Sequence, residues 1–130
     1  MAIPSGSGTE VLKRGAIDGN AAWTYARWDQ AITASGNTST GTVAIPTNCI
    51  ATILNINACN HGGSAAQFAI RVEYSGSSGI YILSNSGTSI PAYDTFVYSE
   101  KIVLGPTDKL QFYNNNATDI VWCYIYQEWT

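Results

Sequence analysis

The sequence has few charged residues. Asp, Glu, Lys and Arg make up 12% of its 130 residues, against about 25% in typical soluble domains. Ser, Thr, Asn, Gly and Tyr must therefore supply most of the polar surface. Because uncharged polar groups lose less on desolvation than unpaired charges do, we expect a surface suited to contact with neighbouring protein subunits.

Neither the cationic residues nor the apolar runs indicate a nucleic-acid or membrane partner. The six cationic residues are spread along the chain, and only Lys13 and Arg14 are adjacent, so no basic patch for phosphates is predicted. The longest apolar run, residues 120–126, is far shorter than the roughly 20 residues of a membrane span. The first residues lack the basic start and apolar stretch of a signal peptide. We therefore expect a soluble protein that is made in the cytoplasm.

Cysteine and histidine are too few to predict a metal site. The chain has three cysteines, without a Cys-x-x-Cys spacing, and one histidine, His61, so a tetrahedral zinc site would lack ligands. On a single strand, Cys49 and Cys59 would stand roughly 33 Å apart at about 3.3 Å per residue, too far for a disulfide. We expect these two and Cys123 to be free thiols, His61 to be a polar loop residue, and no metal or cofactor to be bound.

The titratable residues do not indicate an enzyme. A Ser or Cys nucleophile needs a base within reach, and His61 lies in the Gly-rich residues 60–63, without a Gly-x-Ser-x-Gly context. The two acids of a glycoside hydrolase must lie about 5 to 9 Å apart across a cleft, and the nine acidic residues show no pairing in sequence. Asp94, Asp108 and Asp119 fall in or beside turns, where such side chains most often bond to the local backbone. The sequence therefore predicts no catalytic residues.

The hydrophobic pattern is that of β-strands. No window of eleven or more residues repeats apolar side chains at helical spacing, and β-branched and aromatic residues are common throughout. The expected strands are residues 11–17, 23–32, 41–45, 49–59, 67–74, 80–84, 95–104, 110–114 and 120–129. Short strands between turn residues predict an all-β fold: a single antiparallel β-sandwich, jelly-roll or Greek-key-like, over residues 15–130.

Alternation within these segments predicts which side chains share a face. One face of residues 67–74 carries Phe68, Ile70, Val72 and Tyr74. One face of residues 49–59 carries Ile50, Thr52, Leu54, Ile56 and Ala58. Between strands, the turn residues at 18–20 and 114–116 are expected to reverse the chain.

The last expected strand is apolar on both faces. Val121, Cys123 and Ile125 lie on one side, and Ile120, Trp122, Tyr124 and Tyr126 on the other. Both apolar faces must be shielded from water: one by the domain's own core, and the other by a neighbouring subunit or a loop. We assign Ile120, Trp122, Tyr124, Tyr126 and Trp129 to a subunit interface.

The opening residues allow three interpretations. Ser7 and Glu10 form a Ser-x-x-Glu capping box, but Gly15 would end such a helix within two turns. Residues 4–8 look like a Gly/Ser linker from an expression vector, although no histidine tag precedes them. The interpretation we adopt is an extended arm over residues 1–14. Its expected anchors are Ile3, Val11 and Leu12, with Glu10, Lys13 and Arg14 as rim charges that fix register.

Two segments resemble structural proteins of tailed bacteriophages. MAIPSGSGTEVLKR resembles the amino-terminal signature of small virion proteins, which typically begin Met-Ala-hydrophobic-Pro-Ser-Gly-Ser-Gly-Thr-Glu-Val-Leu. Residues 103–113 resemble the Leu-x-x-Gly-Asp-x-Leu/Ile turn and strand of many phage sandwich domains, although Thr107 and Asp108 replace the usual Gly-Asp pair. Together the two segments cover under half of the chain. The resemblance implies a structural part of a phage particle and leaves head, neck and tail open.

These observations predict a non-enzymatic virion protein. We expect a capsid decoration, or cement, subunit that docks as a homo-oligomer, with a trimer favoured, onto the major capsid protein or another virion protein. The rival is a tail- or neck-associated protein that binds host carbohydrate through aromatic side chains and residues 114–116. For Trp23 and Tyr25, a place in the core or at a subunit interface is favoured over a ligand site, since alternating aromatic residues usually fill a sandwich.

Overall fold

The chain folds entirely into strands and loops over the residues that the computed structural model describes, 8–28, 41–76, 78–84 and 88–129. The strands are β1 (Gly8–Tyr25), β2 (Cys49–Asn60), β3 (Ala66–Glu73), β4 (Ile80–Leu83), β5 (Ser89–Ile90), β6 (Thr95–Tyr98), β7 (Ile102–Leu104) and β8 (Lys109–Trp129). All of their pairings are antiparallel. The predicted all-β, sandwich-like fold is confirmed. None of the described residues builds a helix with the length and apolar character that crossing a bilayer requires.

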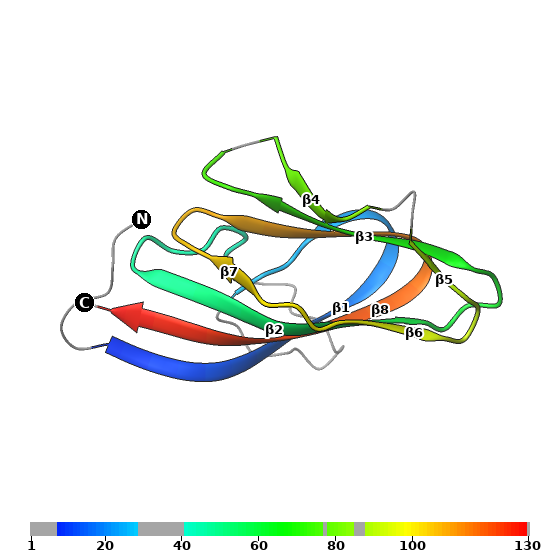
Figure 1. The fold of residues 1–130 in the computed structure, drawn as a ribbon, viewed down its shortest axis with the longest axis horizontal. Helices are drawn as coiled ribbons and strands as arrows, with labels where there is room; N and C mark the ends of the chain where they lie inside the picture. The colour runs from blue at the N-terminus through cyan, green and yellow to red at the C-terminus, as the bar shows by residue number, and fades with distance from the viewer. Residues whose placement is uncertain (1–7, 29–40, 77, 85–87, 130) are drawn as a thin grey trace.

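Two long strands, β1 and β8, connect the two layers. The C-terminal half of β8 pairs with β2, and its N-terminal half pairs with β3, while β1 follows β8 along both halves. Strands β6 and β7 extend the β2 layer, and β4 and β5 extend the β3 layer. The sandwich is thus one curled sheet, in which β1 and β8 bend from one layer into the other (Figure 1).

The expected turns at residues 18–20 and 114–116 are wrong, because both segments lie inside these long strands. They lie close to each other across the ladder, and the register of β1 on β8 shifts between Asn20 and Ala22. Strands that pass from one sheet to another do so through bulges or bends. Residues with turn chemistry therefore mark the corner of the sandwich here and do not reverse the chain.

A second bulge changes the face assignment in β2. The predicted faces hold for Ile56 and Ala58, which are fully buried, but before the bulge the buried residues are Cys49, Ala51 and Ile53. The pairing of β2 with β8 shifts register between Ile53 and Asn55. One extra residue reverses the alternation of every side chain beyond it. The expected inward positions of Ile50, Thr52 and Leu54 are therefore wrong.

Strand β3 follows its predicted pattern. Phe68, Ile70 and Val72 are fully buried, while Tyr74 lies beyond the end of the strand and is 38% exposed. Other expected boundaries are wrong. Residues 95–104 form two strands, β6 and β7, and the strand expected over 23–32 ends at Tyr25, with residues 29–40 outside the described part.

Aromatic side chains fill the space between the layers. The Trp28 ring lies 4.9 Å from that of Tyr124, and the Phe112 ring lies 5.4 Å from that of Trp122. Gly15 allows β1 to approach this cluster, because a Cβ atom there would lie 2.2 Å from the Trp122 indole. Glycine is required here for close approach and not for an unusual backbone angle.

Candidate functional site

The predicted arm residues lie along the domain's own sheet from residue 8 onward. Glu10 pairs with Gln127, Leu12 with Ile125, and so on through the first part of β1. The boundary expected after residue 14 therefore falls inside a strand, and the helix interpretation is wrong for these residues. Ile3 lies outside the described residues. Pairing with β8 explains this placement, because it provides hydrogen-bond partners for the backbone N–H and C=O groups along one edge of residues 10–14.

Four of the five residues assigned to a subunit interface point into the chain's own core. Ile120, Trp122 and Tyr124 are fully buried and Tyr126 is 4% exposed within the single chain. Trp129 is half-buried at the end of β8, and its backbone N–H donates to Asn48 O at 3.1 Å. The assignment to an interface is therefore corrected for Ile120, Trp122, Tyr124 and Tyr126, because the even-numbered face of this part of β8 is the core face. For Trp129, which is odd-numbered, it stays a prediction.

The opposite face of β8 belongs to an apolar surface that crosses four strands. Leu12 of β1, Ile125 of β8, Thr52 of β2 and Val103 of β7 occupy successive positions of one ladder row. A second row contains Val121 of β8 and Val97 of β6, on either side of Asn57. The exposed members are Leu12 at 67%, Val97 at 57%, Val103 at 53% and Val121 at 38%. We call these two rows the outer face.

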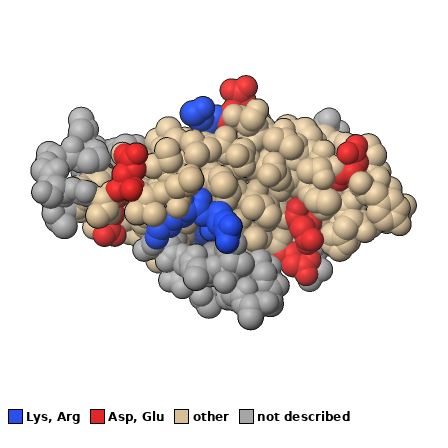
Figure 2. Space-filling view, turned by 90° about the horizontal axis from the view of Figure 1, so that it is seen from below, with Lys and Arg blue, Asp and Glu red and all other residues tan. Residues whose placement is uncertain are grey.

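Charged groups are sparse around the outer face. Glu10 accepts a hydrogen bond from Gln127 at 3.1 Å, and the Lys13 ammonium group lies 5.1 Å from the Tyr126 ring centre. A shallow hollow of about 310 Å³ is lined by Leu12, Lys13, Arg14 and Cys123. Seen from below, most of the visible surface is uncharged, with small separate groups of basic and acidic residues (Figure 2).

A second surface, on the β3 layer, carries aromatic and charged residues together. The Trp23 ring lies 5.8 Å from Tyr81 and 5.4 Å from Tyr113, and the Arg71 guanidinium stacks 3.9 Å from its centre. The Arg71 Nε donates to Gln111 Oε1 at 2.8 Å. These aromatic rings lie on the outside of the sheet, so of the two places expected for Trp23 the core is wrong and a subunit interface stays a prediction. We call this group the aromatic patch.

Tyr25 ends β1 beside this patch and is also outside the core. Its hydroxyl donates to Glu73 Oε2 at 2.9 Å, and the Lys109 ammonium group lies 5.7 Å from its ring. Burial, followed by the hydrogen bond to Glu73, raises the pKa of Tyr25 above its ordinary value. The tyrosine therefore stays protonated at neutral pH and serves as a hydrogen-bond donor.

A group of metal-ligating side chains lies at the end of β2. Asp18 of β1 is directly opposite Asp119 of β8, and His61 follows β2. One ligand atom from each of the three lies within 4.8 Å of the other two, and all three residues are exposed. Partial desolvation by neighbouring atoms, followed by a hydrogen bond with Asp18, raises the pKa of Asp119, and His61 opposes this shift.

Sequence spacing did not predict this group, because its members lie on three separate strands or strand ends. Only the pairing register brings Asp18 opposite Asp119. The outer face was also incompletely predicted: Leu12 was named, but Val97 and Val103 were not. Ile102, Val103 and Leu104 are all apolar, so the sequence carries no signal that Val103 is the exposed one of the three.

The chain matches no protein-family model and no curated protein. One solved structure is similar over 98% of this chain and 95% of its own, with 13% sequence identity and a TM-score of 0.44. It is described in the words "Bacillus endospore appendages form a novel family of disulfide-linked pili". In the present chain, Cys49 is buried, Cys59 and Cys123 are partly buried, and none of the three is in a disulfide.

Proposed function

We propose that this chain is a structural subunit that assembles through its outer face. The observation that carries the proposal is the apolar row from Leu12 through Ile125 and Thr52 to Val103, with its two ends 67% and 53% exposed. Burying a Leu or Val side chain contributes about 1.5–3 kcal/mol. Several such side chains on one rigid sheet supply a useful part of an interface.

The composition of the outer face fits protein contact. Interface cores are depleted in charge and bounded by polar rims. Between the two rows, the charged cross-strand residue is Arg14, opposite Cys123, while Glu10 lies beyond Leu12 on β1. Of the three rim charges expected from the sequence, Glu10 can fix orientation at the edge of such a contact and Arg14 within it, while the apolar side chains supply most of the attraction.

More specifically, we propose that the chain is a decoration subunit of a bacteriophage head. The amino-terminal resemblance supports it, as does a surface with few charges. Such a subunit would form a homo-oligomer, a trimer in our proposal, over junctions in the capsid. Because it binds assembled capsomers better than separated ones, it would stabilise the shell against internal pressure by mass action.

Self-association tests the assembly face directly. We expect Leu12→Asp combined with Val103→Asp to convert the oligomer to monomer, because two carboxylates would have to be buried at the contact. The matched control is Ile80→Asp, since Ile80 is 51% exposed on β4 in the other layer. Sedimentation velocity measures the species. A wild-type monomer at high concentration, or an unchanged oligomer in the double variant, contradicts the proposal.

Binding of the protein to phage particles tests the proposed decoration role. Deleting residues 1–14 would remove more than a third of β1 and leave the end of β8 paired on its β2 side alone, so point substitutions of Leu12 and Val103 are the sharper tool. We expect wild-type protein to saturate purified capsids and the double variant to bind none. Copy number per virion, measured by quantitative mass spectrometry, separates the locations: hundreds of copies support the shell, and a few dozen or fewer support the neck or tail.

The aromatic patch favours one alternative, a carbohydrate-binding module of a fibre or tail. Trp23, Tyr81 and Tyr113 together with Arg71 combine ring faces and hydrogen-bond donors, which are the groups that sugars require. If this alternative holds, oligosaccharides shift the Trp23 indole N–H signal in NMR spectra and Tyr81→Ala weakens binding. Absence of any shift across a panel of bacterial surface glycans counts against it.

A further inference from the structure

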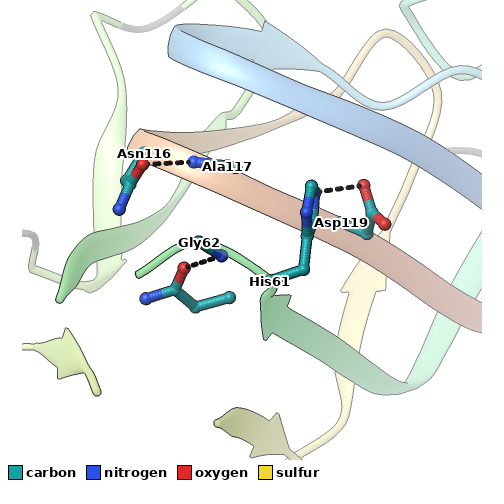
Figure 3. Close-up of polar contacts among 6 residues, drawn as sticks. His61, Gly62, Asn116, Ala117 and Asp119 are labelled. Atoms are coloured by element: carbon teal, nitrogen blue, oxygen red, sulfur yellow. Dashed lines mark hydrogen bonds and ion pairs between the residues drawn. The ribbon is translucent and has the colours of Figure 1, made fainter. Parts of the chain in front are cut away.

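The three-residue group at the end of β2 is built by backbone pairing that is independent of its side chains. Asp18 and Asp119 are cross-strand partners in the β1–β8 ladder. The His61 backbone N–H donates to Ala117 O at 3.0 Å, which fixes the start of the loop against β8. In Figure 3 the His61 side chain reaches toward Asp119 of β8, and its Nε2 lies 3.5 Å from Asp119 Oδ1.

A buried asparagine holds this loop in place. Asn60 is fully buried, and its side-chain amide donates to Ser64 O at 2.7 Å and to Ile90 O at 3.1 Å. Its Oδ1 accepts a hydrogen bond from Gly62 N at 3.0 Å. Because Asn60 precedes His61, the imidazole is carried on an anchored segment and not on a free loop tip. Preorganisation of this kind lowers the cost of binding a ligand.

The two carboxylates make the arrangement costly without a cation. Like charges directly opposite each other on neighbouring strands destabilise the pairing, and Asp18 and Asp119 are such a pair. The His61 and Asp119 side chains are 51% and 54% exposed, so an ion from solvent can reach them. A divalent cation would offset the repulsion and accept all three ligands together.

We propose that Asp18, His61 and Asp119 bind a divalent transition-metal cation, represented by Zn²⁺, that links β1 and β8 to the end of β2. Ligand atoms about 2.0–2.2 Å from a tetrahedral zinc stand about 3.3 Å from each other, and the observed His61 Nε2 to Asp119 Oδ1 separation is 3.5 Å. Imidazole as a ligand favours zinc and its neighbours, whereas Ca²⁺ takes six to eight oxygens. The fourth position remains for water or another donor.

This proposal departs from the sequence-based expectation that no metal is bound. That expectation rested on the single histidine and on the spacing of the cysteines, which are the ligands of structural zinc sites. One histidine and two carboxylates from different strands give a ligand set that spacing along the chain cannot reveal. The inference does not depend on the proposed assembly, because all three ligands belong to one chain.

The test is a Zn²⁺ titration of the untagged full chain. His61 is the sole histidine, so its ring protons give an unambiguous NMR signal. We expect that signal to shift with one equivalent of Zn²⁺ and the melting temperature to rise. Asp119→Asn and His61→Gln should each weaken binding, measured by calorimetry, about tenfold or more, since even residues outside the ligand set change affinity by 10–100-fold.

Two controls separate this site from other binding. Glu100→Gln makes the same charge change as the Asp119 variant on another exposed residue and should retain wild-type affinity. Because Cys59 is the cross-strand partner of Asp119, Co²⁺ absorption is recorded as well, and no thiolate-to-cobalt charge-transfer band is expected. An unmoved His61 signal at millimolar Zn²⁺, equal affinity in all variants, or a thiolate band overturns the proposal.

The melting temperature gives a second test, because Asp119→Asn should change it in opposite directions relative to the wild type without and with Zn²⁺. Without metal, Asp119→Asn should melt at or above the wild-type temperature, because it removes one of two facing carboxylates. With saturating Zn²⁺, the wild type should melt higher and the variant should not respond. A variant that is less stable without metal and gains as much from Zn²⁺ as the wild type would show a purely structural Asp119, and the proposal would fail.

Discussion

Gly15 is the position at which a single methyl group should disturb the whole sandwich. A Cβ atom built there lies 2.2 Å from Cζ2 and 2.3 Å from Cε2 of Trp122, far inside van der Waals contact. Trp122 is fully buried and packs against Phe112 and Trp28, so its ring has little room to move. Gly15→Ala must therefore push the core apart or lift β1 from β8.

Two opposing effects determine how much Gly15→Ala changes the free energy of unfolding. Ala is favoured over Gly within a strand by about 0.5–1 kcal/mol, whereas inserting a methyl group into a packed core costs about 1–3 kcal/mol. The steric cost is the larger because the neighbouring atoms belong to a rigid indole. We expect a net loss of about 1–2 kcal/mol in the free energy of unfolding, which lowers the melting temperature by about 3–8 °C for a domain of this size.

A double-mutant cycle with Trp122→Phe isolates the contact. Phe removes the ring atoms that meet the new methyl group and also removes an indole N–H that has no acceptor among the described residues. In that background, Gly15→Ala should be neutral or stabilising by up to about 0.5–1 kcal/mol. Urea unfolding followed by far-ultraviolet circular dichroism measures all four proteins. Equal effects of Gly15→Ala in both backgrounds would refute the reasoning.

Two further predictions concern carboxylates. Asp108 is 6% exposed and accepts hydrogen bonds from Gly105 N at 2.8 Å and Ser75 N at 3.1 Å, so Asp108→Ala should cost about 1–3 kcal/mol in urea unfolding; no loss would contradict it. The pKa of Asp119 is raised by partial desolvation and then by Asp18, so without metal, stability should fall as pH rises from the ordinary carboxyl range through that pKa. Asp119→Asn should remove this step in the pH profile, and its persistence would count against the prediction.

Part of the fold follows directly from residue patterns. The predicted inward positions of Phe68, Ile70 and Val72 are correct because the pairing of β3 with β8 has no register shift. The predicted bond of the Asp108 side chain to local backbone is also confirmed, by its hydrogen bond from Gly105 N. Both features depend on interactions that a few neighbouring residues determine.

The candidate site was predicted less well, and β8 shows why. Its two apolar faces were recognised, but nothing in residues 120–126 says which of them faces the core. Trp28, from a distant segment, packs on Tyr124 and Trp122 and settles the choice. The exposed row with Leu12 and Val103 is the consequence.

The amino-acid sequence by itself determined the all-β class, the uncharged surface and the existence of a strand with two apolar faces, because composition and period-two alternation are local properties. The tertiary structure alone decided the corner where β1 and β8 bend, the bulge in β2 and the meeting of Asp18, His61 and Asp119. These depend on the register between strands far apart in the chain, and a shift of one residue in register exchanges the inner and outer faces.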